Sequence, residues 1–76
     1  MSLAYYARAV RDSRGILHQI QLRALRDHIR ARSVERIIEE INAIDDVTLL
    51  RTLWEAGLPP ELQKAVLERA RQLTVK

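Results

Sequence analysis

Hydrophobic residues recur along the chain at the three- and four-residue intervals that place side chains on one face of an α-helix. The longest such pattern spans residues 16–31, ILHQIQLRALRDHIRA. At about 100° per residue, two neighbouring sides of this helix are apolar. They are formed by Ile16, Leu17, Ile20 and Ala24, and by Leu22, Leu25 and Ile29. A helix that is apolar around so much of its circumference needs neighbours on two sides, so residues 16–31 are predicted to form the central helix of the fold.

The segments on either side of this helix are predicted to be helical too. Residues 3–12 are good helix formers, and Gly15 either ends their helix or is a weak point inside a longer one. The apolar stripe changes direction by about 120° across Arg32 and Ser33 if one straight helix is assumed. A break with Ser33 as the N-cap of a new helix over residues 34–44 explains that change more simply.

Two further helices are predicted in the second half of the chain. Asp45 or Asp46 can cap a helix over VTLLRTLWEA, and Gly57 follows it as a C-terminal cap. Pro60 then suits the first turn of a last helix. Its core face is expected to comprise Leu62, Val66, Leu67, Ala70 and Leu73. Because the connections are short, the predicted fold class is all-α: a small bundle of four to five short helices forming a single helical domain over residues 1–76.

The composition limits how this bundle can be stabilised. A chain of 76 residues buries only about 60% of the surface of its unfolded state, so its stability is marginal without some supplement. There are no cysteines, and the two histidines lie ten residues apart instead of at the four-residue spacing of a helical zinc pair. No metal or other cofactor is therefore expected, and self-association is the expected supplement.

The sequence shows no apolar run of the roughly 18 residues that span a membrane and no signal-peptide core, so a cytoplasmic protein without membrane contact is predicted.

Charge is distributed unevenly. Residues 8–36 hold eight arginines against three acids, a net charge of 8 − 3 = +5, whereas residues 37–76 hold five basic groups against seven acids, 5 − 7 = −2. The basic half can bind the phosphates of a nucleic acid, or it can bind the acidic half of a second copy. The candidate phosphate contacts are Arg8, Arg11, Arg23, Arg26, Arg30 and Arg32. Glu35, Glu39 and Glu40 in the following helix disfavour a helix-turn-helix arrangement, because they would face the phosphates.

No arrangement of residues indicates catalysis. The acidic pairs Glu39–Glu40 and Asp45–Asp46 are adjacent in sequence, so on a helix their carboxylates would point about 100° apart and would not share a site. There is no glycine-rich phosphate loop, and no serine or threonine lies at helical spacing from a histidine. The chain is therefore predicted not to be an enzyme and to have no small-molecule substrate.

Residues 37–70, IIEEINAIDDVTLLRTLWEAGLPPELQKAVLERA, resemble the helical C-terminal tail of bacterial recombination-promoting nuclease or transposase-like proteins. The likeness is one of layout: an Ile-x-x-Ile helix end, an Asp-Asp cap, a Leu-x-x-Leu helix with a turn, and a last short helix. It covers under half of the chain, and it lacks the upstream nuclease core that carries that family's catalytic carboxylates and lysine. No catalytic residue can be carried over. The resemblance implies a helical accessory or assembly module, near nucleic acid in that family.

The predicted function is a non-enzymatic interaction module that self-associates, most simply as a symmetric dimer. The wide apolar arc of residues 16–31 is the main reason for this prediction. The predicted interface consists of Leu17, Ile20, Leu22, Leu25, Ile29 and Trp54. Nucleic-acid binding through the arginine-rich face of residues 8–36 is the alternative.

Overall fold

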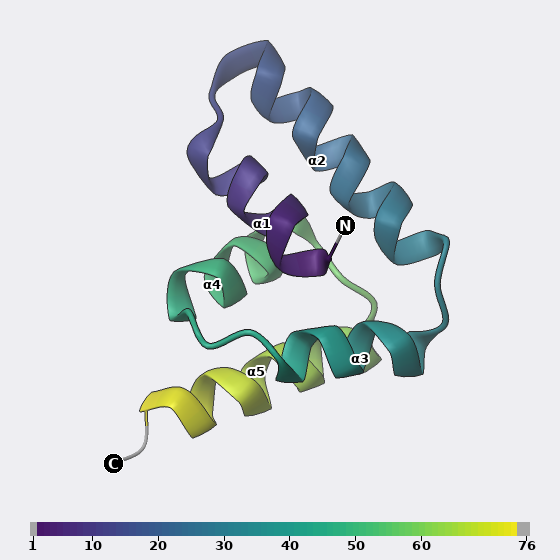
Figure 1. Ribbon diagram of the computed structural model, residues 1–76, viewed down its shortest axis with the longest axis vertical. Coiled ribbons are helices and arrows are strands. Elements are labelled where there is room, and N and C mark those ends of the chain that lie inside the picture. The colour runs from purple at the N-terminus through teal and green to yellow at the C-terminus, as the bar shows by residue number, and fades with distance from the viewer. Residues whose placement is uncertain (1, 75–76) are drawn as a thin grey trace.

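A computed structural model describes residues 2–74, which form five α-helices (Figure 1). They are α1 (Leu3–Asp12), α2 (Gly15–Arg30), α3 (Val34–Asn42), α4 (Val47–Ala56) and α5 (Pro60–Thr74). No strand occurs within these residues. The predicted all-α bundle is confirmed, and the count of helices is at the upper end of the prediction.

Side-chain caps set where three of the helices begin. The Ser33 hydroxyl accepts a hydrogen bond from the Arg36 backbone N–H at 3.2 Å, which confirms the predicted break before α3. Asp46, not Asp45, caps α4 by accepting from the Thr48 N–H at 2.9 Å. Ser2 caps α1 in the same way. The helix predicted over residues 34–44 is shorter, since α3 ends at Asn42.

Two glycines at helix ends have positive φ. Gly15 has φ of 63° and is the first residue of α2, and the extended residues Ser13 and Arg14 separate it from α1, so the first two segments are separate helices and not one long one. Gly57 has φ of 86° and ends α4, as the sequence predicts. A Cβ atom at Gly57 would meet nothing within 4 Å. The requirement for glycine there comes from the backbone conformation, which other residues adopt only with strain.

The hydrophobic core lies among α1, α3, α4 and α5. Its largest fully buried side chains are Leu3, Leu25, Ile37, Ile41, Leu50, Leu53 and Leu62. Only one of these, Leu25, comes from α2. The other four helices therefore form the body of the molecule, and α2 is an addition to it.

The prediction that residues 16–31 form the central helix is wrong. α1 is the helix with neighbours on several sides, since it packs against α2, α3 and α4, whereas α2 packs extensively against α1 alone. Figure 1 shows α2 along the outside of the molecule, with its first turns and the α1–α2 connection projecting from one end. A single neighbouring helix covers only part of a wide apolar arc, so the rest of the arc on α2 remains uncovered within the chain.

Candidate interaction surface

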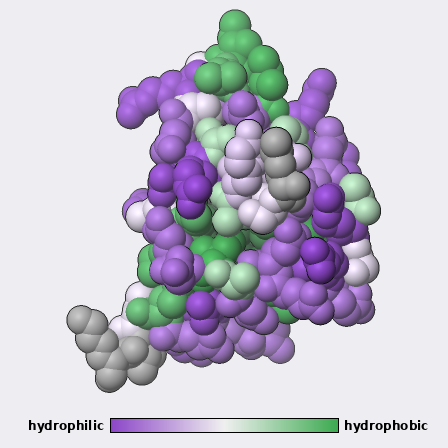
Figure 2. Space-filling model, in the orientation of Figure 1, coloured by the Kyte–Doolittle hydropathy of each residue, from purple (hydrophilic) through white to green (hydrophobic). Residues whose placement is uncertain are grey.

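The first turns of α2 carry a patch of exposed aliphatic side chains. Ile16 is 81% exposed, Leu17 53% and Ile20 58%. Ile16 and Ile20 are one helical turn apart, and Leu17 lies beside them on the same end of the helix. We call these three residues the α2 tip. In Figure 2 the projecting end of the molecule is strongly hydrophobic, and in the orientation of Figure 1 this end holds the α1–α2 connection.

The structure separates the residues predicted to form one interface. Leu17 and Ile20 belong to the α2 tip, whereas Leu22 and Ile29 are half-buried and pack against the core. Leu25 is completely buried within the chain, so it cannot also be a contact for a second copy. The reason is its phase: Leu25 follows Ile16 by nine residues, which at about 100° each places it on the opposite side of the helix.

A second apolar surface lies between α4 and α5, and it contains Trp54. It is a groove of about 160 Å³, lined by Val47, Leu50, Arg51, Trp54, Val66, Leu67 and Ala70. Among these, Val47 is 41% exposed, Trp54 45% and Leu67 49%. The sequence pattern places Leu67 on the core face of the last helix, and the structure shows it at the edge of the core instead. We call this surface the α4–α5 groove.

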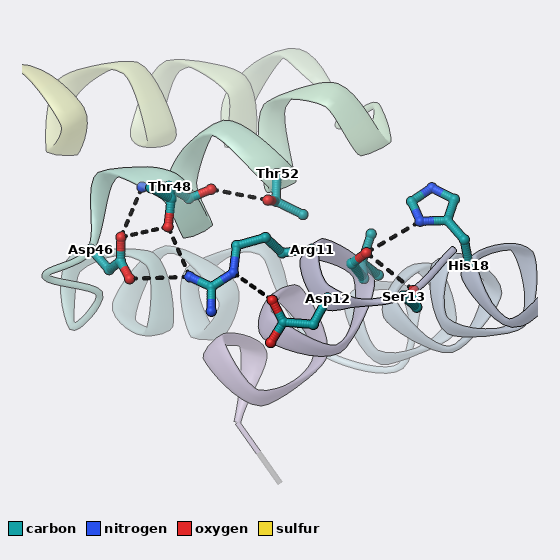
Figure 3. Close-up of polar contacts among 8 residues, drawn as sticks. Arg11, Asp12, Ser13, His18, Asp46, Thr48 and Thr52 are labelled. Atoms are coloured by element: carbon teal, nitrogen blue, oxygen red, sulfur yellow. Dashed lines mark hydrogen bonds and ion pairs between the residues drawn. The ribbon is translucent and has the colours of Figure 1, made fainter. Parts of the chain in front are cut away.

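Arg11, a candidate phosphate contact, is held by groups of its own chain (Figure 3). Its Nε donates to Asp12 Oδ1 at 3.0 Å, and its Nη1 donates to Asp46 Oδ2 at 3.3 Å and to Thr48 Oγ1 at 2.9 Å. The hydrogen bond to Asp12 is the main cause that raises the pKa of Arg11 above its ordinary value. Hydrogen bonds from Thr48, and then the charge of Arg11, lower the pKa of Asp46. Arg11 therefore ties the end of α1 to the cap of α4 instead of facing a ligand.

The remaining candidate phosphate contacts fall into two groups. Arg26 Nη2 donates to the Ala56 carbonyl oxygen at 3.1 Å, and Arg32 Nη1 donates to the His28 carbonyl oxygen at 3.2 Å. Arg8, Arg23 and Arg30 are exposed and take part in no ion pair within residues 2–74. These last three guanidinium groups are the ones that a partner can reach without breaking contacts inside the chain.

His28 and Glu40 form a buried polar contact that the sequence does not reveal. The side chain of His28 is 2% exposed, and its Nε2 lies 3.2 Å from Glu40 Oε2. The second carboxylate oxygen of Glu40 accepts the Leu3 backbone N–H at 3.1 Å, and the ring of Tyr6 packs against His28 with centroids 4.7 Å apart. This contact joins α1, α2 and α3, so its role is to fasten α2 to the body.

One pocket brings hydroxyl groups close to an imidazole: it has a volume of about 370 Å³ and is bordered by Ser13, His18, Thr52 and Glu55. Each hydroxyl there donates to a backbone carbonyl: Ser13 to Val10 at 3.1 Å and Thr52 to Thr48 at 2.9 Å. His18 Nδ1 lies 3.2 Å from the same Val10 oxygen (Figure 3). No hydrogen bond joins a hydroxyl to the imidazole among residues 2–74, so the pocket lacks the nucleophile–base contact that activates a hydroxyl.

Comparison with known proteins gives no match to a family model, to a curated protein or to a solved structure. The resemblance of residues 37–70 to the tail of recombination-promoting nucleases thus stays a prediction. Within the described part of the chain, no three histidine, cysteine or acidic residues gather in a way that could hold a metal ion. Over the same residues, no helix has both the length and the apolar character needed to cross a membrane.

Proposed function

We propose that this protein is a non-enzymatic helical interaction module that self-associates through the α2 tip. The observation that carries the proposal is the exposure of three adjacent aliphatic side chains on a helix that projects from the body. Contiguous apolar patches bordered by polar residues mark protein interaction surfaces. A second copy is the simplest occupant, because a chain this small gains stability when it covers apolar surface by self-association.

The expected strength of this association is modest. Full burial of an aliphatic side chain stabilises by about 1.5–3 kcal/mol. Only part of that is available here, since Leu17 and Ile20 are already about half covered. Association itself costs roughly 4–15 kcal/mol in lost freedom of motion. Because the gain from burial is close to this cost, we expect a weak dimer that dissociates on dilution.

Replacement of Ile16 by glutamate is expected to weaken dimerisation at least about tenfold, because the carboxylate would have to be desolvated in the interface. The fold should survive, since Ile16 is 81% exposed and an acidic residue in the first turn of a helix is favourable. Sedimentation velocity over a dilution series measures the dimer, and circular dichroism checks the helices.

Gln72→Glu is the control for this variant. It introduces the same charge at an exposed, already polar position on α5, away from the hollow that Ile16 and Ile20 line, and it should leave the dimer unchanged. A wild-type chain that stays monomeric at high micromolar concentration would refute the proposed function, as would an Ile16→Glu variant that dimerises normally.

Nucleic-acid binding is the second candidate function, and it is supported by the exposed guanidinium groups of Arg8, Arg23 and Arg30. In this case binding to duplex DNA should fall steeply with rising salt, and Arg23→Ala together with Arg30→Ala should reduce the salt slope by about two. Arg51→Ala is the control, because Arg51 lies outside the basic half and pairs with Glu55. Fluorescence anisotropy at about 50 mM salt provides the measurement, and no detectable binding there would eliminate this candidate.

A further inference from the structure

Two neighbouring hollows run along one side of α2. The first has a volume of about 420 Å³ and is lined by Ile16, Gln19, Ile20, Leu22, Arg23 and Arg26. The second has a volume of about 300 Å³ and is lined by Arg26, Ile29, Arg30, Gly57, Leu58 and Pro59. Arg26 borders both, so the two hollows meet there. We call them together the α2 groove.

The α2 residues that line this groove lie on one face of the helix. They recur at intervals of three and four residues from Ile16 to Arg30, which places them along one stripe. At 1.5 Å per residue this stripe is about 21 Å long. The turn that joins α4 to α5 borders the second hollow beside the last turns of α2 (Figure 1). The groove is therefore as long as about four turns of a helix.

The α2 groove offers apolar surface along its whole length. Ile16 and Ile20 are exposed at its first end, whereas Leu22 and Ile29 are half-buried and pack against the core. No aspartate or glutamate lines either hollow, and Asp27, the one acidic residue of α2, is absent from both linings. The charge of the groove is thus entirely positive.

Three arginines supply this charge. Arg23 and Arg30 are exposed and take part in no ion pair within residues 2–74. Arg26 is held in place, since its Nη2 donates to the Ala56 carbonyl oxygen at 3.1 Å, and a guanidinium group has further N–H donors. Cations beside apolar surface without an acidic neighbour in the lining favour a ligand that is both apolar and acidic.

An amphipathic helix with acidic residues beside its apolar stripe has both properties. Its apolar side chains recur at the spacing needed to cover the aliphatic residues of the groove, and its carboxylates can reach the three arginines. Four turns of such a helix match the length of the groove. The phosphates of a nucleic acid match the arginines but would leave the aliphatic side chains without an apolar partner.

We propose that the α2 groove binds an acidic amphipathic helix of a different protein. The apolar side of that helix lies against the aliphatic side chains of the groove, and its carboxylates pair with the arginines. Ile16 and Ile20 belong to both the α2 groove and the α2 tip, so this helix and a second copy of the chain exclude each other. The inference goes beyond the proposed self-association, because it adds a partner that dissociates the dimer.

Fluorescence anisotropy with a labelled model helix tests the proposal. The probe is a stapled peptide of about 16 residues, with leucines at three- and four-residue intervals and glutamates on both sides of them. The glutamate peptide should bind, and rising salt should weaken its binding. The same peptide with lysines in place of the glutamates should bind at least about tenfold more weakly, because its charges repel the arginines.

Arg30→Glu is the variant that separates the groove from the dimer, because Arg30 lies at the end of α2 away from the tip. It should weaken binding of the glutamate peptide at least about fivefold and leave self-association unchanged. Arg8→Glu is the matched control. It makes the same substitution at an exposed position on α1 that lines neither hollow, and it should bind the peptide like the wild type. A carboxylate in the last turn of a helix is mildly unfavourable, so Arg30→Gln replaces Arg30→Glu if circular dichroism shows a loss of helix.

A two-dimensional NMR titration locates the bound peptide. The amide signals of Gln19, Arg26 and Gly57 should shift most, because these residues line the α2 groove. The indole N–H signal of Trp54 provides the comparison, since Trp54 lines the separate α4–α5 groove. Shifts confined to Trp54 and its neighbours would place the peptide in that other groove and overturn the proposal.

The remaining outcomes separate this inference from its rivals. Equal binding of the two peptides, or unchanged binding by Arg30→Glu, would overturn it, and duplex DNA that binds where the glutamate peptide does not would make nucleic acid the ligand instead. A peptide that binds without dissociating the dimer would overturn the shared use of Ile16 and Ile20. A monomeric wild-type chain that still binds the peptide would refute the proposed function alone, whereas a dimer that binds no peptide would refute only this inference.

Discussion

Replacing Leu25 with alanine is expected to lower the free energy of unfolding by about 2–5 kcal/mol. Leu25 is completely buried and is the one α2 residue among the largest core side chains. Removing most of its side chain leaves a cavity between α2 and the body that surrounding groups fill only in part. For a small domain, whose total stability is about 5–15 kcal/mol, a loss of this size is severe.

Urea unfolding followed by circular dichroism measures this loss. The experiment is best done in the Ile16→Glu background, because dimerisation would otherwise make the apparent stability depend on protein concentration. Leu17→Ala is the matched control: it removes the same atoms from the same helix at a half-exposed position, and we expect a loss below about 1 kcal/mol. Similar losses for the two variants would contradict the assignment of Leu25 to the core and Leu17 to the surface.

Replacing Glu40 with alanine is expected to destabilise the fold by about 2–3 kcal/mol. The carboxylate of Glu40 is the partner of two groups, the imidazole of the buried His28 and the backbone N–H of Leu3. Alanine leaves both without that partner, and a polar group that loses its partner in a buried position retains the cost of its removal from water. The urea midpoint should fall accordingly.

Glu40→Gln distinguishes the two contributions. Its carbonyl oxygen can still accept from the Leu3 N–H, and its amide can donate to an unprotonated ring nitrogen of His28. We therefore expect Glu40→Gln to retain more than half of the stability that Glu40→Ala loses. Equal losses would show that hydrogen-bond geometry at Glu40 is not what stabilises the contact.

Local sequence signals predict the helices well. Ser33 and Gly57 act as a start and a stop because their side chains or backbone preferences operate within a few residues. The change in direction of the apolar stripe at Arg32 and Ser33 likewise predicts that one helix ends there and another begins, and in the structure α2 ends at Arg30 and α3 begins at Val34. These features require no knowledge of which helix packs against which.

Which helices pack against each other is harder to predict from the sequence. The wrong predictions, that α2 is the central helix and that Leu25 lies in an interface, both depend on this. A wide apolar arc shows how much surface a helix can bury, but it does not show how much its neighbours cover. On α2 only one neighbour packs extensively, so Leu25 is buried while Ile16 and Ile20 remain exposed. On α5, Leu67 has the spacing of a core residue but is exposed, because spacing does not show how much of that face the neighbouring helices cover.

The near absence of α2 from the core has a consequence for how this protein can change. Residues on the outward side of α2 make few contacts with the four-helix body, so substitutions there alter the surface without requiring the interior to repack. Leu25 and His28 are the positions that must be kept for attachment. The four-helix body can thus keep its structure while residues on the outward side of α2 are substituted to suit a different partner.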